Sequence, residues 1–316
     1  MNMKLSVVTP VYNEEGNLRR LHEELSGVLG ALNKDYEIIA VNDGSRDGSL
    51  KVLRELSLKD PRFKVIHFQM NHGQTAALSA GIDHASGDII IMIDSDLEND
   101  PKDIPRLLQK IDEGYDVVSG WRKERWADKK LRRKLPSVLA NKLISKITGV
   151  PLHDYGCILK AYKRDVIVGV RLYGEMHRFI PAYASWKGAR VTEIEVTHRM
   201  RTYGKTNYGI SRTFRVLLDL LVVKFLDKFM NRPMHFFGGL GFFSFGIGFI
   251  AGLVAVLFKL AHYRDFVATP LPTFSALFII VGVQLIVMGI LAEILMRTYY
   301  ESQNKKSYIM NEKINF

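Results

Sequence analysis

The sequence contains a single cysteine, Cys157, in 316 residues. This count excludes an intramolecular disulfide and a cysteine-rich zinc site, and it suits a reducing compartment. Only 10 prolines interrupt a chain that is 47% hydrophobic, which excludes a mainly disordered protein. The first residues run directly into a strand-like segment, so we expect no signal peptide. No nucleic-acid-binding module is evident, and we expect no nucleic acid partner.

Acidic residues are in the minority. The chain has 44 Lys and Arg against 33 Asp and Glu, which gives a formal net charge of +11. Such a surplus predicts anionic partners, among them nucleotides, phosphates and acidic lipids. The length suits one large domain or two modest ones.

Charged residues are absent from two long segments, residues 236–258 and 271–292. Each exceeds the roughly 20 residues that cross about 30 Å of hydrocarbon. Core helices of this length usually carry a polar face, whereas these segments have only scattered Ser, Thr and Gln. We therefore predict two transmembrane helices, at about 236–260 and 271–295, joined as an antiparallel hairpin.

The flanks of these segments predict their orientation. Basic residues lie outside both outer ends, and the connection holds only Lys259 and Arg264. The positive-inside rule then places both termini and the N-terminal domain in the cytoplasm, in a multi-pass protein of the inner (plasma) membrane. Residues 210–232 read as amphipathic juxtamembrane helices. Six glycines would let the first span pack closely against a neighbour and leave a homo-oligomer open: Gly238, Gly239, Gly241, Gly246, Gly248 and Gly252.

The first two hundred residues alternate between strand and helix patterns. Short apolar runs predict strands at 5–8, 36–41, 63–68, 89–93 and 116–119, and apolar residues at helical spacing lie between them. Repeated βαβ units predict an α/β fold with a mainly parallel sheet, which binds ligands at the carboxyl ends of its strands. We divide the chain into a catalytic domain (1–209), the juxtamembrane segment (210–232), the hairpin (233–297) and a cytoplasmic tail (298–316).

Polar residues gather where the predicted strands end. Asp94, Ser95 and Asp96 follow the fourth strand directly. Acidic residues at strand ends often cap helices, but two carboxylates one residue apart repel each other unless a cation lies between them. Hard oxygen ligands at this spacing suit Mg²⁺ or Mn²⁺ shared with a substrate diphosphate.

Several motifs, in this order and spacing, carry a resemblance: VVTPVYNEE, VNDGSRDGS, NHGQTAALSAGIDHASGD and IDSDLENDP. Together with SGWR, DYGC and RTYGKT they resemble family-2 glycosyltransferases of the GT-A (Rossmann-like) fold. Within that family the chain looks like the polyprenyl-phosphate glycosyltransferases, which include dolichyl-phosphate mannose synthases and bacterial undecaprenyl-phosphate glucosyltransferases. The resemblance covers nearly the whole chain.

The resemblance implies roles for individual residues. The nucleotide sugar would be bound by Pro10, Tyr12, Glu14, Asp43, Gly73, Gln74, Asp94 and Ser95. A divalent metal would be held by Asp94 and Asp96, with Glu98 as a further candidate at a position where the family often has Gln. Phosphate groups of the acceptor would be received by Arg122, Arg201 and Lys205. Asp154 and Arg201 complete the implied catalytic set with the two aspartates.

The resemblance also implies the reaction. It implies a membrane-anchored, metal-dependent inverting transfer of a hexose, preferably glucose from UDP-glucose, to undecaprenyl phosphate in cell-envelope glycan modification. GDP-mannose with dolichyl phosphate is an alternative. A polymerising synthase is disfavoured because a Gln-x-x-Arg-Trp motif and further spans are missing. A catalytically silent nucleotide-binding scaffold is disfavoured because both aspartates and the basic positions are present.

Overall fold

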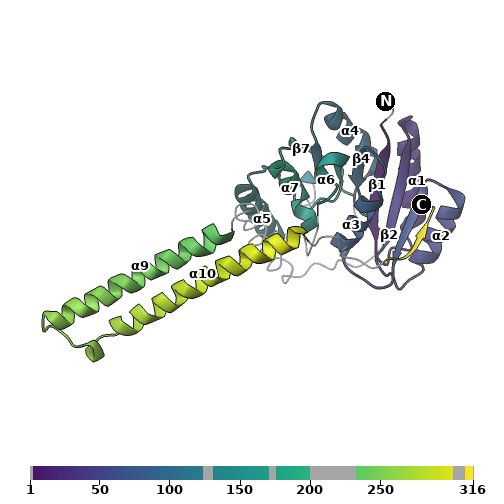
Figure 1. Ribbon diagram of the computed structural model, residues 1–316. Helices are drawn as coiled ribbons and strands as arrows, with labels where there is room; N and C mark the ends of the chain where they lie inside the picture. Colours follow the sequence, from purple (N-terminus) through teal and green to yellow (C-terminus); the bar gives the residue numbers. More distant parts are fainter. Residues whose placement is uncertain (1–2, 124–130, 171–175, 200–232, 302–309, 316) are drawn as a thin grey trace. The chain divides into compact units, whose positions relative to one another are not determined.

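The structure is a computed structural model that describes residues 3–123, 131–170, 176–199, 233–301 and 310–315 (Figure 1). Contacts divide the chain into two compact units. One comprises Met1–Leu221 with Lys306–Phe316, and the other comprises Val222–Lys305. The first holds the α/β domain and the second holds two long helices.

The described strands form one sheet in the order β7-β5-β6-β4-β1-β2-β3-β8. Strands β1 to β4 are parallel and lie at its centre, as the apolar runs predict. β6 runs antiparallel between β4 and β5, and β8 runs antiparallel along β3. The strands span Leu5–Val11, Tyr36–Asn42, Phe63–Phe68, Ile89–Met92, Val117–Trp121, Lys160–Lys163, Val191–Glu195 and Met310–Ile314.

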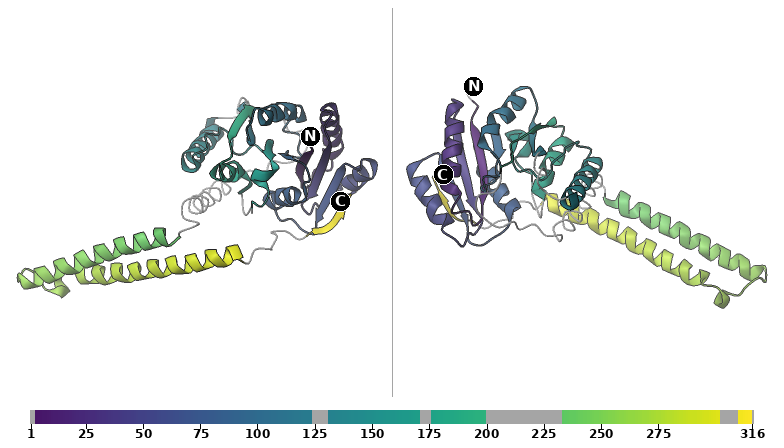
Figure 2. Two further views of the ribbon diagram at one scale, coloured as in Figure 1. Left: turned by 45° about the horizontal axis from the view of Figure 1, so that its top comes forward. Right: turned by 180° about the vertical axis from the view of Figure 1, so that it is seen from behind.

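Helices cover both faces of this sheet (Figures 1 and 2). The main helices of the domain are α1 (Leu18–Ala31), α2 (Ser49–Lys59), α3 (Gln74–His84), α4 (Ile104–Asp112), α5 (Leu131–Thr148), α6 (Arg164–Ile167) and α7 (Ile180–Trp186). Short 3₁₀ turns are η1 (Pro101–Asp103) and η3 (Met176–Phe179).

The core follows from alternation along the strands. Leu5 and Val7 of β1 belong to one buried cluster with the apolar side chains of α1, α2 and α4. Val8 points to the opposite face, against α3, where a Cβ on Gly81 would lie 2.2 Å from Val8 Cγ1. Both faces of the central strands are therefore buried, which is typical of a parallel sheet.

Three strands were not expected from the sequence. β6 and β7 are short, and β8 lies in the segment interpreted as a tail. β8 pairs with β3 from Val65–Ile314 to Phe68–Met310, and Asn315 Nδ2 donates to Ser57 O and Phe63 O. Residues after the hairpin thus complete the sheet of the first unit at its edge.

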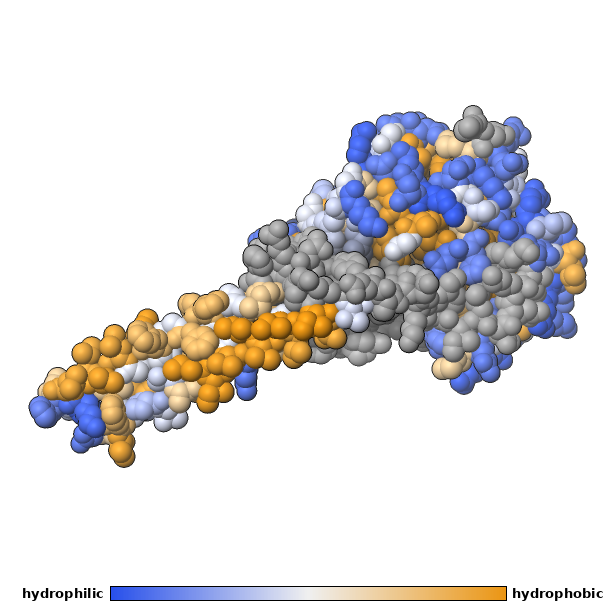
Figure 3. Space-filling model, viewed as in Figure 1, coloured by the Kyte–Doolittle hydropathy of each residue, from blue (hydrophilic) through white to orange (hydrophobic). Residues whose placement is uncertain are grey.

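The second unit is a helical hairpin of α9 (Pro233–Leu260) and α10 (Leu271–Glu301), joined through η4 (Phe266–Ala268). Both helices are long and apolar enough to cross a membrane, and hydrophobic residues coat the hairpin in Figure 3. Ser244 Oγ donates to Phe278 O and Ser275 Oγ donates to Gly248 O across the pair. The predicted juxtamembrane helices, 210–232, lie outside the described residues.

The glycines of α9 divide into two groups. A Cβ on Gly241 would lie 2.9 Å from Gly282 O, and one on Gly248 would lie 3.0 Å from Ser275 O. Gly239 and Gly246 have nothing within 4 Å of a Cβ. The glycines of the first group allow α9 to pack closely against α10. Formation of a homo-oligomer stays a prediction.

Candidate functional site

The carboxyl ends of β1, β2 and β4 lie side by side, because these parallel strands are neighbours in the sheet. Ser95 Oγ, after β4, donates to Pro10 O of β1 at 2.8 Å. Asn13 N, after β1, donates to Ser45 Oγ at 3.0 Å, and Ser45 follows β2. Residues that the motifs place in separate segments therefore meet at one edge.

Glu14 and Tyr12 differ in their surroundings. Tyr12 is 40% exposed at the end of β1. The Glu14 carboxylate accepts from Asn17 Nδ2 at 2.5 Å, and its backbone N–H donates to Ser49 Oγ at 3.0 Å. Glu14 thus joins the starts of α1 and α2, and its expected contact with a nucleoside stays a prediction.

Asp43 organises the loop before α3. Its carboxylate accepts from His72 N at 2.7 Å, from Gly73 N at 2.9 Å and from Asn71 Nδ2 at 2.8 Å. Burial raises the pKa of Asp43, and the two backbone N–H groups oppose the shift only in part. Gly73 has φ +91°, in the left-handed region that favours glycine.

Gln74 and Asp94 lie in direct contact. Gln74 Nε2, at the start of α3, donates to Asp94 Oδ1 at 2.7 Å. The next residue, Thr75, has its Oγ1 2.7 Å from His177 Nδ1, and both side chains are buried. The start of α3 thus orients the first aspartate of the pair and is itself held by η3.

Asp96 is 7% exposed, and its Oδ1 accepts from Glu98 N at 3.0 Å. Among the described residues no three His, Cys, Asp or Glu side chains gather into a metal-binding cluster. The metal ligands that the resemblance implies, Asp94 and Asp96 with Glu98 as a further candidate, stay a prediction. Two carboxylates still fit Mg²⁺ or Mn²⁺, because such an ion takes its remaining ligands from substrate phosphates and water.

Arg122 and Asp154 form a buried ion pair. Arg122 Nε donates to Asp154 Oδ2 at 2.8 Å and Arg122 Nη2 donates to Oδ1 at 3.2 Å. The side chains are only 3% and 9% exposed. The sequence assigns these two residues to different tasks, whereas the structure makes them one unit between the end of β5 and the loop before β6.

A cavity of about 440 Å³ adjoins this pair. Its lining includes Arg122, Lys142 of α5 and the stacked rings of Trp121 and His153, whose centroids are 4.3 Å apart. The combination of cationic and aromatic side chains suits an anionic group attached to an apolar chain.

Lys160 is a functional candidate that the sequence analysis missed. It is 1% exposed in β6, and its Nζ donates to Tyr155 O at 3.2 Å and to Cys157 O. Burial lowers the pKa of Lys160 to about 8, with Asp154 opposing the shift and Arg122 and Arg178 adding to it. The available signal was a lysine directly after the apolar residues 157–159.

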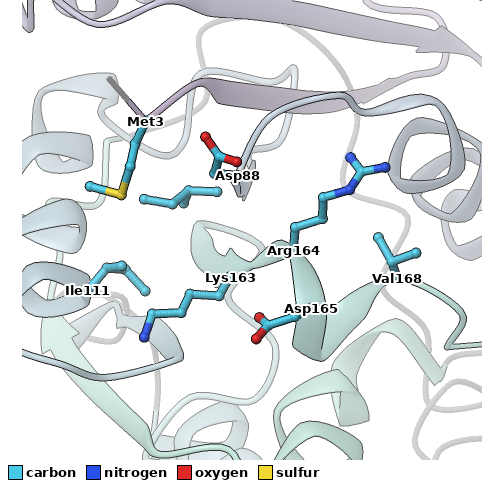
Figure 4. A pocket seen from close by; sticks show the side chains of 8 residues that line it. Met3, Asp88, Ile111, Lys163, Arg164, Asp165 and Val168 are labelled. Atoms are coloured by element: carbon cyan, nitrogen blue, oxygen red, sulfur yellow. The ribbon is translucent and has the colours of Figure 1, made fainter. Parts of the chain in front are cut away.

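A second cavity, of about 490 Å³, lies at the opposite end of the sheet. Asp88 and Lys163 line it beside Met3 and Ile111 (Figure 4). Lys163 Nζ is paired with Asp116 Oδ1 at 2.7 Å. Because this cavity is at the amino ends of β1 and β4, it is separate from the site described above.

Arg201 and Lys205, which the resemblance assigns to the acceptor phosphate, lie outside the described residues.

Comparisons with known proteins agree on the family and fold. The model of glycosyl transferase family 2 matches residues 6–170. A dodecaprenyl-phosphate galacturonate synthase from Rhizobium johnstonii is 42% identical over 98% of this chain and 93% of its own length. An undecaprenyl-phosphate 4-deoxy-4-formamido-L-arabinose transferase from Aeromonas hydrophila is 36% identical over 98% of this chain and 93% of its own.

Solved structures support the architecture. Glucosyl-3-phosphoglycerate synthase from Mycobacterium tuberculosis, in complex with Mn²⁺, UDP-glucose and phosphoglyceric acid, matches with a TM-score of 0.55 and 18% identity. The match covers 70% of this chain and 79% of that one. The mixed, mostly parallel sheet is thus a GT-A fold, as the motifs imply.

Proposed function

The chain belongs to glycosyl transferase family 2, among its polyprenyl-phosphate glycosyltransferases, and we propose that it transfers galacturonate from UDP-galacturonate to a polyprenyl phosphate. The 42% identity to the galacturonate synthase, over 98% of the chain, carries this proposal. The sequence-based preference for glucose is corrected, because the sugars of these relatives are galacturonate and 4-deoxy-4-formamido-L-arabinose. Mannose is not supported by them either. We choose UDP as the nucleotide of the donor because the structurally similar glucosyl-3-phosphoglycerate synthase was solved with UDP-glucose.

The charge around Asp154 supports an anionic sugar. Arg122 and Arg178 both lie close enough to Lys160 to lower its pKa, and Asp154 is the acid that opposes them. Three basic groups and one carboxylate thus lie near one another in this part of the domain. Because an excess of buried positive charge is costly, an arriving carboxylate or phosphate is attracted to this cluster.

The cavity beside Arg122 is the proposed place of the acceptor phosphate. Arg122 is held by Asp154, which fixes the plane of its guanidinium, and Lys142 adds a second positive charge. Apolar side chains of Val138, Pro151 and Leu152 line the same cavity and suit the first isoprene units.

The chemistry is one displacement. An acceptor phosphate oxygen forms a bond to C1 of the sugar while the bond from C1 to the diphosphate oxygen breaks, and the electron pair leaves with UDP. The acceptor oxygen is already anionic near neutral pH, so the site orients it and needs no strong base. An α-linked donor then yields a β-linked product.

Asp94 and Asp96 are the proposed holders of Mg²⁺ or Mn²⁺. A bound divalent ion supplies Lewis-acid stabilisation of the leaving diphosphate. Gln74 orients Asp94, and the backbone N–H of Glu98 orients Asp96. Asp43 fixes residues 71–73, and the resemblance places Gly73 and the next residue, Gln74, beneath the nucleotide.

The hairpin gives this reaction its location. We propose that α9 and α10 span the inner membrane, with the catalytic domain and both termini in the cytoplasm, as the basic flanks predict. A polyprenyl phosphate stays in the bilayer, so the enzyme must meet its phosphate at the membrane surface. Arg201 and Lys205, close in sequence to the first span, are proposed to contact phosphate there.

The activity test uses purified full-length protein with undecaprenyl phosphate, Mn²⁺ and labelled UDP-galacturonate, UDP-4-deoxy-4-formamido-L-arabinose or UDP-glucose. We expect label from UDP-galacturonate in an organic-extractable, mild-acid-labile lipid. Asp96→Asn should lower the rate by about 100-fold or more, because the ion's ligand is lost. Asp165→Asn, at the remote cavity, is the matched control and should retain activity.

Other outcomes would overturn the proposal in distinct ways. Preferential transfer from one of the other two donors would reject galacturonate alone. A water-soluble polymer would indicate a polymerising synthase. Tight nucleotide binding without turnover of any donor would indicate a silent scaffold.

A further inference from the structure

The turn that follows Asp96 has an unusual backbone. Leu97 has φ +62°, in the left-handed region that a branched residue rarely adopts, and its side chain is 3% exposed. The same turn brings Glu98 N to Asp96 Oδ1. The direction of the Asp96 carboxylate therefore depends on a turn that other contacts must hold in place.

Those contacts come from a segment about one hundred residues later in the chain. Arg199 N donates to Glu98 O at 2.8 Å, and Asn99 and His198 form an isolated antiparallel bridge. Asn99 is 1% exposed, and its Nδ2 contacts Cys157 Sγ at 3.7 Å. Residues 198–199 thus lie along residues 98–99 like a short added strand.

The side chain of Arg199 adds contacts to two carboxylates beside this backbone pairing. Its Nη2 lies 2.6 Å from Asp100 Oδ2, and its Nε donates to the same oxygen at 3.1 Å. Its Nη1 donates to Glu24 Oε2, on α1, at 2.6 Å. The guanidinium therefore joins the loop after β4 to a helix of the central fold, and its charge is used by two carboxylates.

We infer that Arg199 is a positioning residue for the donor site. By tying Asp100 to Glu24 and its own backbone to Glu98, it holds the Leu97 turn and thereby directs Asp96 toward the donor diphosphate and its cation. A direct phosphate contact by Arg199 is disfavoured, since its guanidinium faces two acids. This inference rests on the proposed role of Asp96.

The test is binding of UDP to the full-length protein by calorimetry, with and without Mn²⁺, beside steady-state kinetics. Arg199→Met should weaken Mn²⁺-dependent UDP binding and raise the donor KM by about tenfold. Metal-free UDP binding, the acceptor KM and the melting temperature should stay near wild type. Arg199→Lys should recover part of the loss, because it keeps the charge without the two-pronged geometry.

Two further variants sharpen the test. Asp100→Asn should reproduce the defect. Combining it with Arg199→Met should weaken Mn²⁺-dependent UDP binding little further, because both substitutions break the contact between Arg199 and Asp100. Arg19→Met is the matched control: Arg19, on α1, is also paired with a glutamate, but its partner is Glu55 of α2 and the pair lies at the surface. It should leave Mn²⁺-dependent binding unchanged.

The failures are distinguishable. If Asp96→Asn abolishes Mn²⁺-dependent UDP binding while a folded Arg199→Met retains it, the inference about Arg199 is wrong and the role of Asp96 stands. If Asp96→Asn itself retains that binding, the role of Asp96 fails and the inference falls with it. An equal loss of metal-free and metal-dependent binding in Arg199→Met would instead make Arg199 a direct nucleotide contact.

Discussion

Two buried acids of this protein, Glu37 and Asp43, differ in their hydrogen-bond partners and therefore in their roles. Glu37 of β2 accepts from Ser6 Oγ at 2.5 Å and from Ser86 N at 2.7 Å, and it lies 2.9 Å from Lys64 Nζ. These contacts join neighbouring strands at the amino end of the sheet. Asp43 instead binds backbone N–H groups at the carboxyl end, where it shapes a loop of the site.

Glu37→Gln is expected to destabilise the fold. Burial raises the pKa of Glu37, but hydrogen bonds from Ser6, Lys64 and Ser86 outweigh it and lower the pKa to about 2. The substitution removes the carboxylate charge that Lys64 Nζ contacts, at a cost on the order of 2–3 kcal/mol. Chemical denaturation in detergent at pH 7 measures the loss, with Glu55→Gln, at a half-exposed ion pair with Arg19, as the control.

The pH dependence follows from the same shift. Because the pKa of Glu37 is lower in the folded state, its contribution is fully present above about pH 4.5 and is lost as the pH falls toward 2. The difference in stability between wild type and Glu37→Gln should shrink over that range. A difference that stays constant down to pH 3 would show that the ionised carboxylate is not the source.

At the scale of elements, the hairpin depends on close contact between backbones. Gly241 of α9 and Gly282 of α10 face each other, so that a Cβ on either residue would lie about 3 Å from the other's carbonyl oxygen. Small residues allow such an approach, and packing between apolar helices in lipid depends on it.

Gly241→Leu should therefore separate α9 from α10, while Gly246→Leu should be tolerated because nothing lies within 4 Å of a Cβ there. The two variants add the same side chain to the same helix, so their difference isolates the interhelical contact. Melting in detergent and protease resistance of the hairpin are the measurements. Equal stability of the two variants would contradict this packing.

The elements also show how far sequence patterns reach. Apolar periodicity predicts β1 to β5 and the intervening helices in the right order, because each pattern reports burial of its own segment. α1 begins at Leu18, after a turn in which Asn17 Nδ2 donates to the Glu14 carboxylate. β8 carries no such pattern, since its strand form depends on pairing with β3.

At the scale of the whole molecule, the chain leaves the catalytic unit for the hairpin and returns to the same unit. Residues 310–314 extend the sheet formed by the first seventy residues. The hairpin is thus inserted into the catalytic domain rather than appended to it, and its two apolar helices are connected to the domain by the chain on both sides.

The orientation of that insertion is testable by labelling. Val267, in the connection between α9 and α10, is 100% exposed, and the native Cys157 is fully buried. Val267→Cys should react with a membrane-impermeant maleimide added to intact cells. Lys51→Cys, on α2 of the catalytic domain, should react only after permeabilisation. The reverse pattern would invert the proposed topology.

The sequence by itself determined the apolar strands, the two apolar helices and the order of the motifs, since each depends on residues close together in the chain. The tertiary structure alone decided that Arg122 pairs with Asp154, that Asp43 binds the loop before α3, and that Arg199 joins Asp100 to Glu24. Local periodicity records which side chains are buried. It holds no information about which distant charge each buried group meets, because that depends on how strands and loops are brought together by folding.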